Sequence, residues 1–185
     1  MAAPQMTSTT NIQPVHAQEL DAYLDHLIRH APASDHDGAP TTPQLPGDRP
    51  TRAQLASRLC EAWARPLEEP IWIRSWALRD KEQLVGHIQL QGGKFRSDLH
   101  RATLIIGLEV AYRARGYGRL LLETVLRWSR ETPLEWIDLG VFENNEPARK
   151  LYRRMGFVEC GTRVDAFRVD DDVSVTDISM SLKLD

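Results

Sequence analysis

The sequence predicts an α+β fold in a single domain, with a central sheet of about six or seven strands flanked by about four helices. Three observations support this prediction. The chain has 185 residues, a length typical of one domain with its own core. Short runs of branched and aromatic residues recur as strand patterns, and the longer segments between them repeat apolar residues at helical spacing. Charged residues make up 26% and hydrophobic residues 42% of the chain, which is ordinary for a globular protein.

The first part of the chain is mostly helical in pattern. Residues 1–8 are expected to be disordered, and 9–185 form the single domain, which starts with a modest strand over 9–15. Residues 17–29 carry an apolar stripe typical of an amphipathic helix. Residues 31–50 hold five prolines, two glycines and three aspartates, which predicts a long loop. Apolar residues four apart then predict a second helix from Thr51 to Pro66.

The rest of the chain alternates strand and helix patterns. A hairpin, a buried strand, a fifth strand and two closing strands are expected at 71–78 with 84–90, 104–110, 136–142, 157–167 and 173–184. Helices are expected over 120–128 and 145–155.

A strand-to-helix connection stands out at Arg113-Ala-Arg-Gly116-Tyr-Gly118-Arg119. A strand that turns through glycines into a helix presents unpaired backbone N–H groups at the positive end of that helix, and such an end binds anions, phosphates above all. Glycine allows close approach of a ligand, and arginine adds permanent charge. No third glycine completes a dinucleotide fingerprint, and no Gly-Lys-Ser/Thr follows for a Walker loop.

A second motif covers residues 145–157, Asn-Glu-Pro-Ala-Arg-Lys-Leu-Tyr-Arg-Arg-Met-Gly-Phe. Asn145 suits a helix N-cap, Pro147 suits the first turn and Gly156 suits the end of the helix. Both motifs resemble signatures of the GNAT (N-acetyltransferase) superfamily: Arg/Gln-x-x-Gly-x-Gly/Ala after the fourth strand, and Asn-x-x-Ala-x-x-Leu-Tyr-x-x-x-Gly-Phe further on. The order of predicted elements also fits that family over nearly the whole chain.

The resemblance implies a mixed, mostly antiparallel sheet and an acetyl group moved from acetyl-CoA, as co-substrate, to a primary amine of a small molecule or peptide. Tyr152 would be the general acid that protonates the leaving thiolate, and Asn145 would bind the cofactor's arm. Backbone groups between Ile106 and Val110 would hold the acetyl group and pantetheine, and those from Arg113 to Leu120 the pyrophosphate. The residues implied in cofactor binding are thus Ile106, Leu108, Glu109, Val110, Arg113, Ala114, Arg115, Gly116, Tyr117, Gly118, Arg119, Leu120, Asn145 and Tyr152.

The general base is the part of the chemistry that the motifs leave open. An alkylammonium with a pKa near ~10.4 is neutral only about once in ~2,500 molecules at pH 7, so deprotonation costs roughly 4.6 kcal/mol. Some relatives carry a glutamate on the fifth strand for this purpose, at the position of Gly140 here. Glu109 and Glu143 are the candidates in this sequence, and His100 or a water chain are alternatives. Each glutamate is about equally well explained as a solvated surface carboxylate.

Composition limits the classes of partner and the cellular compartment that we expect for this chain. Lys and Arg number 23 against 26 Asp and Glu, for a net charge of −3, which provides no electrostatic footprint for nucleic acid. Two cysteines without metal-site spacing suggest free thiols. With no signal-peptide pattern and no run of ~20 apolar residues, a cytoplasmic location without membrane contact is expected. His26 and His30 lie four apart on a predicted helix, where an exposed polar face is the expectation, and no metal site is predicted.

Three readings of the function remain. The chain is an amine acetyltransferase, an enzyme of the same fold with another acyl-CoA donor, or a non-catalytic acyl-CoA-binding regulatory module. The segment 31–50 occupies a region that shapes acceptor sites in relatives, which makes it a candidate acceptor-site lid. Polyamines, antibiotic amines, amino acids and protein N-termini all stay open as acceptors. Pairing through C-terminal strands is common in such folds and is compatible with a homodimer.

Overall fold

A computed structural model of the chain describes residues 10–33, 46–170 and 173–185. The strands are β1 (Thr10–Pro14), β2 (Ile73–Asp80), β3 (Gln83–Gly92), β4 (Arg101–Leu108), β5 (Trp136–Phe142), β6 (Val158–Asp170) and β7 (Val173–Lys183). The α-helices are α1 (Leu20–Ala33), α2 (Arg52–Ala64), α3 (Tyr117–Ser129) and α4 (Glu146–Arg154). Short 3₁₀ turns are η1 (Ala17–Glu19), η3 (Pro46–Asp48), η4 (Arg96–Asp98) and η5 (Val110–Tyr112).

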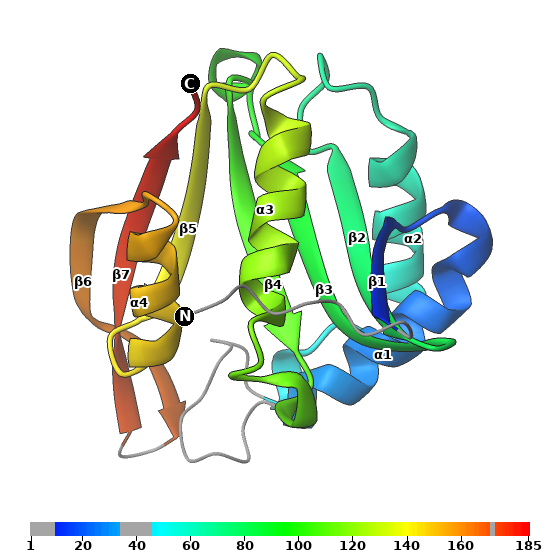
Figure 1. The fold of residues 1–185 in the computed structure, drawn as a ribbon, viewed down its shortest axis with the longest axis horizontal. Coiled ribbons are helices and arrows are strands. Elements are labelled where there is room, and N and C mark those ends of the chain that lie inside the picture. Colours follow the sequence, from blue (N-terminus) through cyan, green and yellow to red (C-terminus); the bar gives the residue numbers. More distant parts are fainter. Residues whose placement is uncertain (1–9, 34–45, 171–172) are drawn as a thin grey trace.

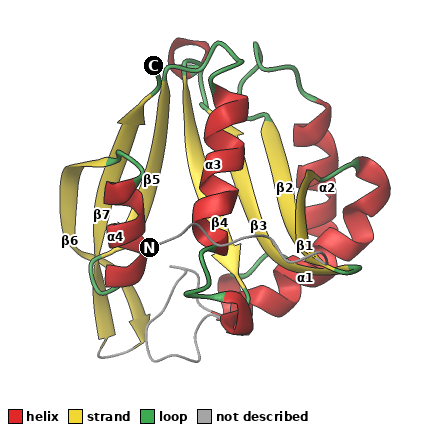
Figure 2. Ribbon diagram, viewed as in Figure 1, coloured by secondary structure: helices red, strands yellow, loops and turns green. Residues whose placement is uncertain are grey.

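All seven strands belong to one sheet, in the order β1-β2-β3-β4-β5-β7-β6. Neighbours pair antiparallel except β4 and β5, which run parallel because α3 connects them. The predicted α+β fold, with its mixed and mostly antiparallel sheet and four flanking helices, is confirmed (Figure 2).

The two faces of the sheet are covered by different helices. Helices α3 and α4 lie on the face turned toward the viewer in Figure 1, and α1 and α2 lie behind it. Successive strand residues point to opposite faces, so Trp76 and Leu78 of β2 join the core under α3, while Ile73 and Ala77 join the core with α1 and α2.

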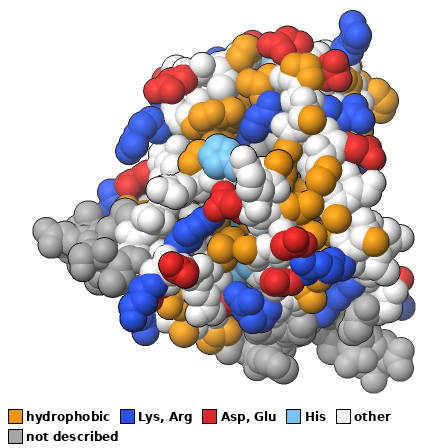
Figure 3. All heavy atoms as spheres, turned by 90° about the vertical axis from the view of Figure 1, so that its right-hand side faces the viewer, with side chains coloured by type: hydrophobic (Ala, Val, Ile, Leu, Met, Phe, Trp, Pro, Cys, Tyr) orange, Lys and Arg blue, Asp and Glu red, His pale blue; other side chains and the backbone are white. Residues whose placement is uncertain are grey.

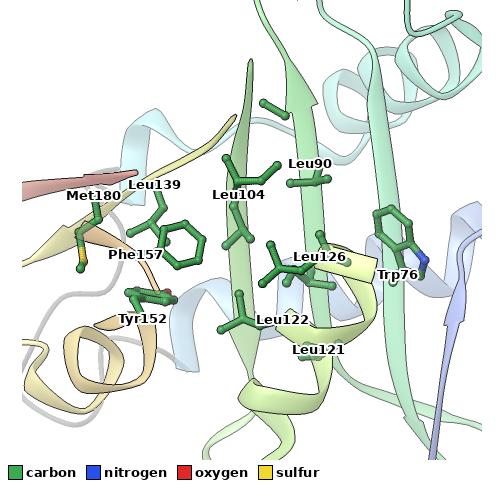
Figure 4. Packing of buried hydrophobic residues seen from close by; sticks show 14 of the residues in the cluster. Trp76, Leu90, Leu104, Leu121, Leu122, Leu126, Leu139, Tyr152, Phe157 and Met180 are labelled. Atoms are coloured by element: carbon green, nitrogen blue, oxygen red, sulfur yellow. The ribbon is translucent and has the colours of Figure 1, made fainter. Parts of the chain in front are cut away.

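The larger core lies under α3 and α4. Leu121, Leu122 and Leu126 of α3 pack on Leu90 and Leu104 of the sheet (Figure 4). Each of these leucines is less than 5% exposed, and a Leu→Ala change at such a site typically costs about 2–5 kcal/mol. This packing holds α3, and therefore the loop that precedes it, rigidly against β4.

Local sequence explains where the helices begin. The Thr51 hydroxyl oxygen accepts a hydrogen bond from the Gln54 amide, and the Gln54 side-chain oxygen accepts one from the Thr51 amide, so α2 starts with a capping box. Asn145 Oδ1 accepts from the Ala148 amide at 3.3 Å and caps α4, with Pro147 in the first turn as predicted.

Several boundaries differ from the sequence expectations. The first helix starts as η1 and continues to Ala33, so the loop predicted from residue 31 begins later. Residues 34–45 of that loop lie outside the described residues, as do residues 1–8, where disorder is expected. The strand predicted over 104–110 ends at Leu108 because η5 follows. None of the described helices is long and apolar enough to cross a membrane.

Candidate functional site

The candidate site lies where β4 and β5 separate. The two strands pair only at Arg101↔Trp136, Ala102↔Ile137 and Thr103↔Asp138. Beyond that point β4 stays paired with β3, and β5 with β7. Each strand therefore has one edge whose backbone N–H and C=O groups are not bonded to the other strand. Figure 1 shows the two ribbons diverging toward the end at which α3 begins.

The closed end of this separation is held by an ion pair. Arg101 donates from Nε and Nη2 to the two carboxylate oxygens of Asp138, at 2.8 and 2.6 Å. Ser181 Oγ on β7 donates to the same carboxylate at 2.6 Å. The Arg101 guanidinium also stacks over the Trp136 ring, 4.8 Å from its centroid. Bidentate geometry of this kind fixes orientation, so the point at which the strands part is well defined.

The loop between β4 and α3 has the backbone conformation that its glycines predict. Gly116 is the N-cap of α3 with φ +85°, a left-handed conformation that glycine adopts without strain. The Arg119 and Leu120 amides donate to the Gly116 carbonyl, whereas the amides of residues 116–118 donate to no residue in the described part of the chain. These N–H groups lie at the positive end of a 13-residue helix.

The arginines of the loop have separate partners. Arg113 Nε donates to the Leu108 carbonyl at 3.1 Å and so binds the loop back to the end of β4. Arg115 lies over the Tyr112 ring, 5.9 Å from its centroid, and Arg119 pairs with Glu123 at 2.7 Å. Gly118 permits a close helix contact, because a Cβ there would lie 3.1 Å from Leu151 of α4.

Tyr152 lies on α4 and faces the sheet. Its ring packs 5.9 Å from that of Phe157, beside Leu139 and Met180 (Figure 4). The side chain is 6% exposed, and its hydroxyl donates to no described residue. Burial raises the pKa of this hydroxyl to about 12, so the group stays protonated throughout the neutral range.

Glu109 follows β4 directly and faces α1. Arg29 donates to its Oε1 from Nε and Nη2, at 3.1 and 2.9 Å. His26 Nδ1 lies 3.6 Å from the same oxygen. The carboxylate remains 20% exposed, so solvent or a ligand can reach it.

Three histidines meet beneath Glu109, on the face of the sheet that α1 covers. His26 Nε2 is 3.0 Å from His87 Nδ1 of β3, and the His30 ring lies 5.3 Å from that of His87. A side chain at Gly107 of β4 would collide with both His30 and His87. The described residues contain no group of histidine, cysteine and acidic side chains arranged to hold a metal ion.

The expectation of an exposed polar face at His26 and His30 is wrong. His26 is fully buried and His30 is half-buried, because α1 lays this side of the helix on β3 and β4. Burial lowers the pKa of all three histidines, that of His30 to about 4, because desolvation disfavours the charged ring. The three rings are therefore neutral at pH 7.

The other predicted residues lie around the separation at different places. Glu143 follows β5 and is exposed; its backbone carbonyl accepts from Arg149 at 3.0 Å. His100 precedes β4 at the closed end, where its carbonyl accepts from the Glu135 and Trp136 amides. The whole length of β4 separates His100 from Glu109, which corresponds to about 30 Å at ~3.3 Å per residue of an extended strand.

Comparison with known proteins gives the family. A family model described as the acetyltransferase (GNAT) family matches residues 41–157, which is more than half of the chain and includes both glycine-containing motifs. The chain belongs to the GNAT acetyltransferase family. It is thus a GNAT-type N-acetyltransferase.

A curated relative covers most of this chain, and two solved structures share its fold over nearly the whole chain. "Uncharacterized N-acetyltransferase YycN" of Bacillus subtilis is 29% identical over 154 residues, covering 82% of this chain and 94% of the relative. An N-acetyltransferase from Staphylococcus aureus Mu50 has a TM-score of 0.78 at 16% identity, covering 96% of this chain and 100% of the other. The structure of yncA, a putative acetyltransferase from Salmonella typhimurium with its cofactor acetyl-CoA, has a TM-score of 0.75 at 16% identity and covers 96% and 95% of the two chains.

Sequence reasoning missed several neighbours of the candidate residues in this acetyltransferase. Nothing in the pattern around Arg29 predicts its contact with Glu109, 80 positions later. The strand pattern around Asp177 likewise does not predict that its carboxylate lies against Gly140 of β5. His87 did carry a signal, because it stands within the apolar run Leu84–Leu90, where a histidine is expected to be buried.

Proposed function

We propose that this acetyltransferase moves an acetyl group from acetyl-CoA directly to a primary amine of a small molecule or peptide, with Tyr152 as the acid and Glu109 as the base. The observation that carries the proposal is the separation of β4 and β5. Around it lie two strand edges that do not pair with each other, a loop whose amides donate to no described residue, and the buried Tyr152, whose hydroxyl has no hydrogen-bond partner among the described residues. Glu109 lies beside it on the opposite face of the sheet from Tyr152.

The residues present fit an acyl-CoA. Amides of residues 116–118 at the start of α3 suit a pyrophosphate, because a helix N-terminus favours anions. The unpaired edges of β4 and β5 suit the amide groups of a pantetheine arm, which can bond to a strand edge as another strand would. Acetyl-CoA, when bound, supplies an acetyl thioester whose carbonyl carbon accepts the amine nitrogen as the C–S bond breaks.

Tyr152 acts on the leaving sulfur through its hydroxyl proton. Full proton transfer from a phenol with a pKa of about 12 to a thiolate whose thiol has a pKa of ~8.5 is unfavourable by about 3.5 pKa units, or roughly 5 kcal/mol. Burial raises the pKa of a thiol as well, so a sulfur held in the same apolar surroundings is a stronger base than in water. Tyr152 therefore donates a hydrogen bond early in the reaction, and the proton moves as charge develops on sulfur.

Glu109 is the better placed of the two glutamates to take the amine proton. Its carboxylate is oriented by Arg29 and remains 20% exposed at the end of β4. Glu143 lies beyond the end of β5 on the exposed surface, and the structure orients only its backbone. In the proposed reaction Glu109 accepts the proton that the amine nitrogen loses as the C–N bond forms.

The test is release of free thiol from acetyl-CoA with a panel of amines: a polyamine, an aminoglycoside, single amino acids and short peptides. We expect release with one class. Tyr152→Phe should lower kcat by about 10²-fold or more while acetyl-CoA still raises the melting temperature.

Unchanged turnover in Tyr152→Phe would remove this residue from the mechanism. If acetyl-CoA stabilises the protein but no amine releases thiol, another acyl donor or a binding role replaces the proposal. If acetyl-CoA neither reacts nor stabilises, the proposed donor is wrong.

A further inference from the structure

A carboxylate from β7 lies against Gly140 in the part of β5 that is not paired with β4. Gly140 stands two residues beyond Asp138, the last β5 residue paired with β4. A Cβ at Gly140 would lie 3.0 Å from Oδ1 of Asp177. Leu139 and Val141 point into the core under α3 and α4, so Gly140 and Asp177 lie on the other face, the one that Glu109 also occupies.

No described residue donates a hydrogen bond to the Asp177 carboxylate. Its side chain is only 18% exposed, and it accepts no hydrogen bond from the described residues. Its one cationic neighbour there is Arg163 of β6, whose Nη2 is 3.9 Å from Oδ2, beyond hydrogen-bond distance. A half-buried carboxylate that accepts no hydrogen bond from the described residues can bind a ligand that supplies N–H groups and positive charge.

The surroundings of Arg163 indicate which kind of ligand the Asp177 carboxylate would bind. Its guanidinium lies 4.8 Å from the centroid of the Phe167 ring, and Phe167 packs against Phe142, the residue that pairs with Asp177. A carboxylate beside an aromatic face is an arrangement that binds cations. The Arg163 side chain is 62% exposed, and an ion pair this long and open contributes little, so another cation can replace it at small cost.

We propose that Asp177 binds an ammonium group of the acceptor and that Arg163 occupies this place when no acceptor is bound. This rests on the proposed function and specifies the class of acceptor. The nitrogen that attacks must be neutral, so it is not the one that Asp177 holds as an ammonium ion. The acceptor therefore carries a second amino group, with Glu109 on one side of the separation and Asp177 on the other, and is a diamine or polyamine.

The experiment compares α,ω-diamines of three to five carbons with the n-alkylamines of the same length, at saturating acetyl-CoA. Asp177→Asn should lower kcat/KM for the diamines about tenfold, a change that corresponds to about 1.4 kcal/mol. The same variant should leave kcat/KM for the monoamines unchanged. Gly140→Ala, which displaces the carboxylate, should act in the same direction. Arg163→Gln should lower KM for the diamines, and this gain should vanish when Asp177→Asn is added.

Glu131→Gln is the matched control, because Glu131 is an exposed carboxylate at the end of α3, far from the site. The proposal is overturned if Asp177→Asn affects monoamines and diamines equally, or if Glu131→Gln has the same effect.

A separate readout covers the case in which no amine releases thiol and the proposed function fails. With CoA present, the diamines should still raise the melting temperature of the wild-type protein and not that of Asp177→Asn. Absence of this rise in the wild-type protein would overturn the ammonium site itself.

Discussion

At the scale of single residues, Glu109 and Glu143 have the same side chain and different surroundings. Two nitrogens of Arg29 orient Glu109, and the neutral His26 ring lies 3.6 Å away. Such contacts limit the rotamers of the carboxylate and so hold its free oxygen in one place. Preorganisation of this kind is what a proton acceptor needs, because a displacement of about 1 Å can cost 10²-fold in rate.

The same substitution at both positions tests this difference. Glu109→Gln should lower kcat/KM at pH 7 by about 10²-fold and abolish the acidic limb of the pH–rate profile, because the group that accepts the proton is gone. Glu143→Gln should stay within about twofold of the wild type. Equal melting temperatures would show that both variants fold, and a pH profile unmoved by Glu109→Gln would reject Glu109 as the base.

The sequence predicted the local positions of the motif residues, but it did not predict the contacts between residues far apart in the chain. Asn145, Gly116 and Tyr152 occupy the cap, turn and helix positions expected of them, because spacing along one helix or loop determines those positions. The burial of His26 depends on α1 meeting β3, and the contact of Asp177 with Gly140 depends on β7 lying between β5 and β6. These are pairings between segments far apart in sequence, which local periodicity does not contain.

At the scale of elements, the start of α3 depends on the backbone of Gly116. An alanine at φ +85° costs about 1–2 kcal/mol and favours a turn that aims the following amides elsewhere. Gly116→Ala should therefore raise KM for acetyl-CoA about tenfold and lower the melting temperature. Gly47→Ala is the matched control, because a Cβ at Gly47 meets nothing within 4 Å. Wild-type KM for acetyl-CoA in Gly116→Ala would show that the loop amides do not bind the donor.

A comparison of predicted and observed strand boundaries shows which sequence patterns predict a boundary correctly. The strand predicted over 136–142 is β5 as observed, because its apolar residues alternate between two clear turns. The strand predicted over 104–110 ended two residues early, since Val110 continues the apolar run but belongs to η5. Residue type alone does not distinguish a 3₁₀ turn from the end of a strand, because an apolar residue in such a turn can be exposed. Val110, for example, is 44% exposed.

At the scale of the whole molecule, two helix layers are attached to the sheet in different ways. α3 and α4 are attached by an apolar core, whereas α1 and α2 combine a smaller core with ion pairs. Arg52 of α2 pairs with Asp21 and Asp25 of α1, and Arg79 pairs with Glu19. Figure 3 shows the resulting mixture of positive and negative side chains on the face formed by β1, α1 and α2. Of these pairs, only Arg79 with Glu19 is largely buried, and the exposed ones contribute little each.

The histidine cluster makes the attachment of α1 sensitive to acid. His26, His30 and His87 have pKa values below 6.5 in the folded protein and near ~6.5 in the unfolded chain. Above about pH 7.5, one unit over the unfolded pKa, neither state binds many protons at these rings, so their contribution to stability is nearly constant. As the pH falls from about 7.5 toward 4, the unfolded chain binds protons that the folded protein does not, and the free energy of unfolding decreases, most steeply below pH 6.5. Each ring contributes up to about 1.4 kcal/mol per pH unit.

Urea unfolding at pH 7.5, 6.5 and 5.5 measures this loss directly. Glu19, Glu146 and Glu159 also have lowered pKa values in the folded protein, but their contribution is lost below about pH 4.5, so the histidines dominate between 6.5 and 5. His30→Gln should reduce the decrease between pH 6.5 and 5.5, because one titrating ring is removed. His16→Gln, at an exposed position before η1, should keep it. A free energy of unfolding that stays constant from pH 7.5 to 5.5 in the wild-type protein would mean that the cluster opens to water and that α1 is not held on the sheet by neutral histidines.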